Sequence, residues 1–166
     1  MSEIVRAVES DLTEIGEVYA AARVFMAANG NASQWGPGRY PQERLLREDV
    51  ACGRLFVLKR NGRIAAVFAL AEGAEPTYAV IEGGAWPNDL PYITIHRLAS
   101  RPDEHGTAYE CIRFAESLCR EKGIGLRADT HRNNTVMRHI LENSGFRYCG
   151  VIRVRGSERL AYSMEI

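Results

Sequence analysis

The chain has 166 residues, of which 46% are hydrophobic and 25% charged, and its 21 Lys plus Arg residues balance 21 Asp plus Glu residues. This length and composition suit one buried core, so we expect a single soluble domain over residues 1–166. The balanced charge and the lack of a long basic block argue against a nucleic-acid partner. No apolar run reaches the roughly 18 to 20 residues of a membrane span, and the N-terminus lacks a basic and then apolar leader. We therefore expect a cytoplasmic protein without a membrane partner.

The cysteine and histidine spacings predict no metal site. The four cysteines form no CxxC pair, and the four histidines form neither HExxH nor a zinc-finger spacing. We interpret the cysteines as small apolar residues in a reducing compartment.

The first third of the chain reads as a strand followed by two helices. Residues 4–8 have strand character, and residues 10–29 carry apolar side chains at helical spacing. Residues 30–41 are rich in glycine, proline and small polar residues, which predicts a loop. A second, short helix is expected over residues 42–52.

The middle of the chain favours β-structure. Asn61-Gly62 separates two β-prone runs within residues 54–71, and this dipeptide predicts a hairpin with a type I′ turn. Residues 77–81 could form a short strand. Residues 91–100, YITIHRLAS after a proline, predict a longer one, in which strict alternation would put Thr94, His96 and Leu98 on one face.

The last third alternates helices and strands. A helix is expected over residues 108–122, a strand over 124–130 and a helix over 133–145. Residues 146–154 and 158–166 then form a terminal hairpin. The strand–helix–strand crossover implies one parallel pair in a sheet that is otherwise antiparallel. We predict an α/β fold with a mixed, mostly antiparallel central sheet and helices on both faces, with ligands bound where neighbouring strands diverge.

The segment RPDEHGTAYE, residues 101–110, joins the longer strand to a helix and contains one glycine. The first N–H groups of a helix have no intrahelical acceptor, and the helix dipole is positive at that end. With Gly106 admitting an oxygen close to the backbone, this turn is suited to an anion. Arg101 and His105 would add positive charge against Asp103, although an ordinary turn is the more common interpretation of such a segment.

Several motifs in this order resemble the GNAT superfamily of acyl-CoA-dependent N-acyltransferases. They are the strand–loop–helix just described, a T-x-x-N motif at residues 130–133, and a following helix that ends in Gly145-Phe146. YITIHRLAS, DTHRNN and the closing GSERLAY are similar to a group of bacterial members mostly of unassigned substrate. The resemblance covers essentially the whole chain and implies the GNAT, or acyl-CoA N-acyltransferase, fold.

The resemblance implies acetyl-CoA as the acyl donor. In the family the loop after the fourth strand reads Gln or Arg, two residues, Gly, one residue, then Gly or Ala, and its amides hold the coenzyme A pyrophosphate. Residues 103–108 keep the glycine and the alanine but begin with aspartate. An asparagine after the next strand often touches the coenzyme arm, although a plain helix cap is an equal alternative for it. The implied coenzyme contacts are Leu98, Ala99, Ser100, Arg101, His105, Gly106, Thr107, Ala108, Asn133 and Asn134.

Transfer to an amine needs a base for the ammonium form and a proton source for the departing thiolate. His96 is the candidate base, with a hydrogen-bonded structural histidine as the alternative interpretation. His131, at the end of the next strand, is a weaker alternative base and could instead lie near the coenzyme. In many family members a tyrosine donates this proton to the thiolate, and this chain has Leu141 at that position. Tyr148 or Cys149 could take that role, although each is more commonly a packed sheet residue.

The acceptor pocket is expected to use the loop between the first two helices and the residues before the longer strand. The candidates are Gln34, Trp35, Tyr78 and Trp86, whose aromatic rings could hold an amine by cation–π contact. A loop tryptophan nevertheless more often caps the core edge.

The leading hypothesis is an N-acetyltransferase that transfers an acetyl group from acetyl-CoA to a primary amine of a small molecule or peptide. The alternative is a catalytically silent acyl-CoA-binding sensor or regulatory module, suggested by Leu141. A structural domain without coenzyme is a third reading. A homodimer is also considered, because a partner often covers the edge strands of a small sheet.

Overall fold

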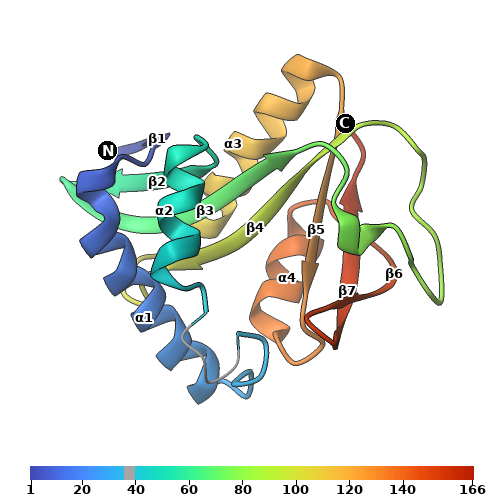
Figure 1. Ribbon diagram of the computed structural model, residues 1–166, viewed down its shortest axis with the longest axis horizontal. Helices are drawn as coiled ribbons and strands as arrows, with labels where there is room; N and C mark the ends of the chain where they lie inside the picture. Colours follow the sequence, from blue (N-terminus) through green and yellow to red (C-terminus); the bar gives the residue numbers. More distant parts are fainter. Residues whose placement is uncertain (36–39) are drawn as a thin grey trace. The chain divides into compact units, whose positions relative to one another are not determined.

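The structure is a computed structural model that describes residues 1–35 and 40–166. Residues 36–39, inside the predicted loop 30–41, lie outside the described residues. The seven strands are β1 (Ser2–Arg6), β2 (Leu55–Arg60), β3 (Arg63–Glu72), β4 (Tyr92–Ser100), β5 (Gly125–Thr130), β6 (Arg147–Val154) and β7 (Ser157–Met164). They follow the order β1-β2-β3-β4-β5-β7-β6 in one sheet. Strands β4 and β5 pair in parallel (Figure 1). The predicted α/β class and mostly antiparallel sheet are confirmed.

The chain divides into two compact units, which are described one at a time. The first comprises residues 1–70 and 97–111, and the second residues 71–96 and 112–166. That residues 1–166 form one domain stays a prediction. Among the described residues, no helix has the length and apolar character needed to cross a bilayer.

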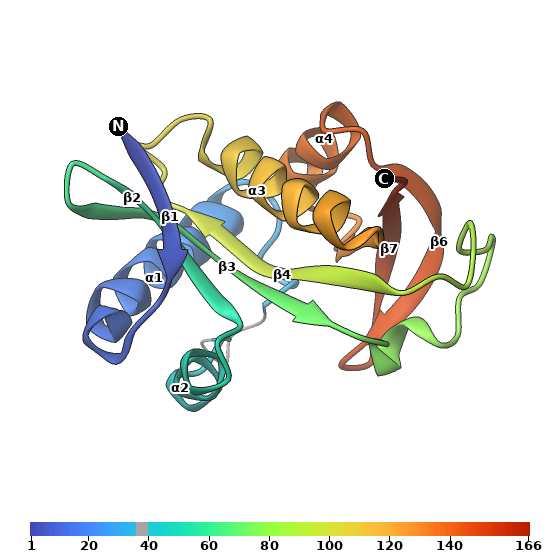
Figure 2. The same ribbon diagram turned by 90° about the horizontal axis from the view of Figure 1, so that it is seen from above.

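The first unit is built on an antiparallel arrangement of β1, β2 and β3. Asn61 and Gly62 have φ values of 52° and 75°, as the predicted type I′ turn requires. Figure 2 shows α1 and α2 on one side of these strands and the start of α3 on the other, so this unit has helices on both faces. Its elements are β1 (Ser2–Arg6), a 3-10 turn (Glu9–Asp11), α1 (Leu12–Ala28), α2 (Glu43–Ala51), β2 (Leu55–Arg60), most of β3 (Arg63–Glu72), the end of β4 (Tyr92–Ser100) and the start of α3 (Thr107–Lys122).

The core of the first unit is formed by one face of α1 against the strands. Ile15, Val18, Tyr19 and Ala22 recur at helical spacing and are all buried. They pack in one cluster with apolar residues of β2 and β3. The apolar residues that recur at helical spacing within residues 10–29 therefore form the face of α1 that packs against the strands.

Strand β4 departs from the predicted alternation near its end. Arg97 has a φ of 52°, in the left-handed region that strand residues other than glycine rarely adopt. Strict alternation from Thr94 through His96 to Leu98 is therefore wrong for the last part of the strand. Such an irregularity turns the following residues relative to the rest of the strand.

The second unit contains the parallel pair and the terminal hairpin. Strand β7 pairs antiparallel with both β5 and β6, so it lies between them. The short strand predicted over residues 77–81 is wrong, because Pro76–Tyr78 form a 3-10 turn and only Glu82 makes an isolated bridge to β6. The remaining elements are β5 (Gly125–Thr130), α4 (Thr135–Asn143), β6 (Arg147–Val154) and β7 (Ser157–Met164).

The segment before β4 approaches β6 backbone to backbone. A Cβ atom on Gly84 would overlap the carbonyl group of Cys149, and one on Gly150 would meet the carbonyl oxygen of Glu82 at 2.7 Å. Glycine at both positions allows this contact. The two glycines thus help to hold residues 81–84 against the irregular part of β6.

Candidate functional site

The turn between β4 and α3 presents unpaired backbone donors. Gly106 has a φ of 74°, and a Cβ atom added to it would meet nothing within 4 Å. Helix α3 starts at Thr107, whose hydroxyl donates to the Ser100 hydroxyl at 2.7 Å and so ties the helix to the strand end. The amides of Gly106, Thr107 and Ala108 have no acceptor among the described residues. Such donors at the start of a helix are suited to an anion, and their binding of the coenzyme A pyrophosphate stays a prediction.

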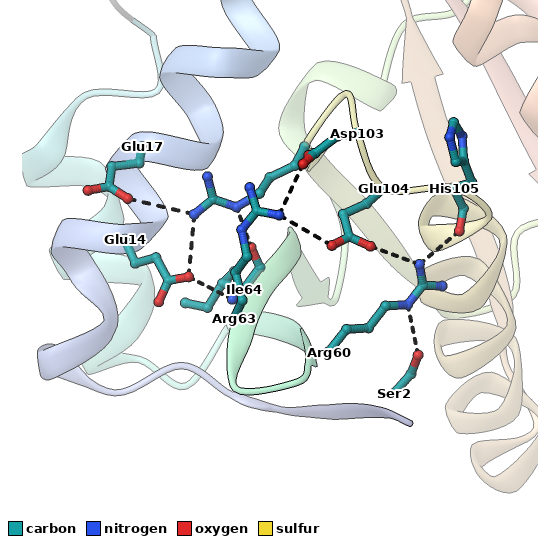
Figure 3. Close-up of polar contacts among 10 residues, drawn as sticks. Ser2, Glu14, Glu17, Arg60, Arg63, Ile64, Asp103, Glu104 and His105 are labelled. Carbon is teal, nitrogen blue, oxygen red and sulfur yellow. Dashed lines mark hydrogen bonds and ion pairs between the residues drawn. The ribbon is translucent and has the colours of Figure 1, made fainter.

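Asp103 and Glu104, the acidic residues of this turn, are paired with arginines of the β2–β3 hairpin. The Asp103 carboxylate lies 3.1 Å from Arg63, and the Glu104 carboxylate lies 3.1 Å from Arg60 (Figure 3). The hydrogen bond from Arg63 lowers the pKa of Asp103. Arg60 also donates to the carbonyl of His105 at 2.9 Å. The aspartate that departs from the family pattern thus anchors the loop to the hairpin.

Arg101 is engaged by helix α1 and by the hairpin. Its Nη2 atom lies 3.3 Å from the Glu14 carboxylate and 3.6 Å from that of Glu17. Its Nε atom donates to the carbonyl of Ile64 at 2.7 Å. Because its guanidinium already has these partners, an anion at this turn would depend on the backbone amides rather than on Arg101.

A buried ion pair supports the end of β4. Asp49 on α2 is fully buried and pairs with the guanidinium of Arg97 and, at 3.1 Å, with that of Arg54. The Tyr19 hydroxyl donates to the carbonyl of Arg97 at 2.7 Å, and burial raises the pKa of Tyr19 well above its ordinary value. Helices α1 and α2 therefore both hold the residue at which β4 becomes irregular. Sequence reasoning missed this network, because nothing in the spacing links residues 19, 49 and 97.

The first two acceptor candidates, Gln34 and Trp35, lie in the first unit. Trp35 is only 9% exposed and packs edge-on against Tyr19 with ring centroids 5.7 Å apart. The Gln34 side chain accepts a hydrogen bond from Asn31 at 3.1 Å. Trp35 thus caps the core edge, and it also lines an open groove of about 510 Å³ beside the C-terminal half of α1.

In the second unit His96 forms a pair with a carboxylate that the sequence did not suggest. Among the described residues the parallel pairing of β4 with β5 ends at Thr94, and His96 lies just beyond it. The His96 Nε2 atom is 3.6 Å from Glu75 Oε2. The neighbouring His96 ring is the main cause that lowers the pKa of Glu75 to about 2, so the carboxylate is charged at neutral pH. No motif signalled Glu75, which lies in the irregular segment before β4.

The lowered pKa of Glu75 predicts a contribution to acid stability. Because its folded pKa is about 2 against an ordinary value of 4.5, the contribution is complete above pH 4.5 and is lost as pH falls toward 2. It amounts to roughly 3 kcal/mol at most. Urea unfolding between pH 2 and 7 should show a smaller loss of stability in Glu75→Gln than in the native protein. Equal losses in the two proteins would contradict the assignment.

The other two acceptor candidates, Tyr78 and Trp86, lie together in the second unit. Their ring centroids are 4.9 Å apart, and the Trp86 indole donates to the carbonyl of Tyr78 at 2.9 Å. Tyr78 is only 2% exposed, and its hydroxyl donates to Asp129 at 2.7 Å. The Arg127 guanidinium lies over the Trp86 ring, 4.3 Å from its centroid. The cation–π contact expected for an amine is therefore made by an arginine of the protein itself.

Asn134 caps α4, which is one of the two interpretations derived from the sequence. Its Oδ1 atom accepts from the Met137 amide at 3.0 Å, and the Asn133 amide donates to the ring of His131 at 3.0 Å. A coenzyme contact of either asparagine stays a prediction.

The candidate proton donors lie on β6. Tyr148 is 52% exposed, and burial raises the pKa of Cys149, which is partly buried. Leu141, at the position of the family tyrosine, is 2% exposed. That position therefore offers no proton donor, whereas both β6 residues carry one.

Comparison with known proteins identifies the fold. No family model and no curated protein matches the sequence. Among solved structures, an acetyltransferase of the GNAT family from Streptococcus agalactiae is 29% identical, with a TM-score of 0.88, over 99% of this chain and 95% of that chain. The chain has the GNAT fold. The resemblance read from the sequence is thus confirmed.

Two further GNAT-fold structures contain coenzyme A or a derivative of it. The PaiA N-acetyltransferase from Thermoplasma acidophilum, in complex with coenzyme A, is 17% identical over 100% of this chain and 99% of that chain, with a TM-score of 0.71. Naa50 from Arabidopsis thaliana, in complex with the bisubstrate analogue CoA-Ac-MVNAL, is 12% identical over 99% of each chain, with a TM-score of 0.67. At these identities the two comparisons support the shared GNAT fold alone.

Proposed function

We propose that this protein is an acetyl-CoA-dependent N-acetyltransferase that acts on a primary amine of a small molecule or peptide. The observation that carries the proposal is the turn at Gly106, where the amides of Gly106, Thr107 and Ala108 lack an acceptor within the described part of the chain, in a chain with the GNAT fold. The coenzyme A complex of the PaiA structure supports the choice of donor. The peptide-like analogue bound to Naa50 is one reason to keep peptides among the acceptors.

The donor would be held mainly by backbone groups. The amides of Gly106, Thr107 and Ala108 would receive the pyrophosphate, with the dipole of the 16-residue α3 adding positive potential. Backbone groups of Leu98, Ala99 and Ser100 would hold the pantetheine arm. When bound, acetyl-CoA supplies the acetyl thioester.

The acceptor side would be served by side chains that exchange protons. His96 is partly exposed and of the residue type best suited to accept a proton near neutral pH, so it would deprotonate the ammonium form of the amine. The Cys149 thiol has a raised pKa and stays protonated at neutral pH, as a proton donor to the leaving thiolate must. The exposed Tyr148 is the second candidate for that role.

A catalytically silent coenzyme A sensor is the second candidate function, and the buried Leu141 favours it. This function predicts coenzyme binding without thiol release for any amine. Thiol release with one amine of a broad panel would exclude it.

Millimolar acetyl-CoA is expected to raise the melting temperature of the native protein, by about 5 to 10 °C if the concentration is 100 times Kd. In Gly106→Val the shift should disappear, because a branched side chain would fill the space in front of the amides. Gly123→Val is the matched control: Gly123 ends the same helix, has a φ of 67° and also has nothing within 4 Å. Differential scanning fluorimetry measures both. An absent shift in the native protein, or equal loss in the two variants, would contradict the proposed donor site.

A further inference from the structure

We propose that Glu75 is a positioning residue for His96. It orients the imidazole so that the Nδ1 atom of His96 faces the amine as the proton acceptor. The proposal rests on the proposed function and adds a residue and an atom to it. It is carried by the contacts of Glu75 and His96 within the second unit.

Glu75 is held on three sides. Its Oε1 atom accepts from the Thr77 hydroxyl at 3.0 Å and from the Thr77 amide at 3.5 Å. Its own amide donates to the Tyr92 hydroxyl at 2.8 Å, which fixes the backbone of residue 75 against β4. The other carboxylate oxygen, Oε2, faces His96 at 3.6 Å. The two oxygens thus have separate partners, and the one toward His96 has a defined direction.

The segment that carries Glu75 is itself anchored. The Arg127 guanidinium lies 4.0 Å from the centroid of the Tyr92 ring and 4.3 Å from that of Trp86, and it donates to the carbonyl of Asn88 at 2.8 Å. An arginine between two aromatic rings makes cation–π contacts with both. The C-terminal part of the segment between β3 and β4 is therefore pinned to β4 and β5.

The charge on Glu75 selects one tautomer of His96. An ionised carboxylate can only accept a hydrogen bond, so the Nε2 atom beside it carries the proton. In the neutral imidazole the lone pair is then on Nδ1. Among the described residues Nδ1 has no hydrogen-bond partner, and it is not buried. The contact of 3.6 Å is long for a hydrogen bond, as such contacts often are before substrate is bound.

The proton transfer balances within these groups. An N–H bond of the substrate ammonium breaks, its electron pair remains on the amine nitrogen, and the proton forms a bond to Nδ1. The resulting imidazolium carries both ring protons and faces the Glu75 carboxylate, whose opposite charge stabilises it. The proton later leaves Nδ1 for solvent. Other titratable groups around Glu75 are Tyr78, whose hydroxyl is bonded to Asp129, and Tyr92.

The test is a double-mutant cycle on thiol release from acetyl-CoA. Native protein, Glu75→Gln, His96→Ala and the double variant are assayed with the best acceptor of a panel containing putrescine, tyramine, lysine and a tetrapeptide with a free N-terminus. Glu75→Gln should lower kcat by about tenfold to a hundredfold, less than the largest losses known for carboxylates that orient a catalytic histidine. Adding it to His96→Ala should change kcat by less than about twofold. KM for acetyl-CoA should not change.

One readout separates positioning from a merely structural role. Long-range ¹H–¹⁵N NMR should show His96 with the proton on Nε2 above pH 8 in the native protein, and a mixture of tautomers in the variant. Glu72→Gln is the matched control, since Glu72 is an exposed carboxylate of the same unit paired with Lys122.

The outcomes distinguish this proposal from the proposed function. If the native protein turns over and the effects of the two substitutions multiply, or if the His96 proton lies on Nδ1, the role of Glu75 is overturned and the acetyltransferase function is left intact. No turnover with any amine in the panel would overturn both.

Discussion

Asp49→Ala is expected to lower the free energy of unfolding by about 3 to 5 kcal/mol. Asp49 is fully buried and its two oxygens accept from Arg54 and Arg97. Removing the carboxylate leaves the largely buried Arg97 guanidinium, 13% exposed, without its counter-charge. An uncompensated buried charge costs far more than the net worth of the pair, which is why the expected loss is large.

The measurement is urea unfolding at pH 7, followed by circular dichroism. Glu43→Ala is the matched control, because Glu43 begins the same helix and pairs with Arg47 at 2.8 Å in an exposed position. Glu43→Ala should lower the free energy of unfolding by no more than about 0.5 kcal/mol. If Asp49→Ala also lost less than about 1 kcal/mol, the ion pair would not support the end of β4.

His96→Ala is expected to lower kcat for acetyl transfer by about 10² to 10⁴-fold, the usual contribution of a general base. Binding of acetyl-CoA should be unchanged, since the amides at Gly106 and Thr107 hold the donor in the proposed site. Thiol release at pH 7 and titration calorimetry with acetyl-CoA measure the two quantities separately.

His139→Ala is the control for that substitution. His139 is an exposed histidine on α4 that is hydrogen-bonded to Asn143 at 2.9 Å, and its loss should leave kcat within about twofold. A kcat for His96→Ala within threefold of the native value would leave His96 as a structural histidine paired with Glu75. Reduced acetyl-CoA binding would instead indicate a folding defect.

Local signals in the sequence were enough to place most elements. The helical period of residues 10–29 and 108–122, the Asn61-Gly62 dipeptide and the apolar run before Ser100 each describe a neighbourhood of a few residues. Backbone sterics and side-chain spacing act at that range, so they can be read without knowing the fold. The turn at Gly106 belongs to the same class, because an unpaired helix start follows from the helix boundary alone.

The sequence could not show which distant residues meet. Asp103 pairs with Arg63, Asp49 with Arg97, and Glu75 with His96. In each pair the two residues are too far apart in the sequence for any spacing rule to connect them. The predicted short strand at residues 77–81 failed for the same reason, since Tyr78 is held by Asp129 instead of by a neighbouring strand.

The strict alternation predicted for β4 is likewise broken at Arg97, which is held by Tyr19 of α1 and Asp49 of α2. Burial and ion pairing depend on the whole packed chain, and they outweigh local preferences of about 1 kcal/mol or less. The turn that could hold the donor could therefore be predicted from residues 101–110. The carboxylate that could orient the base could be identified only from the folded structure.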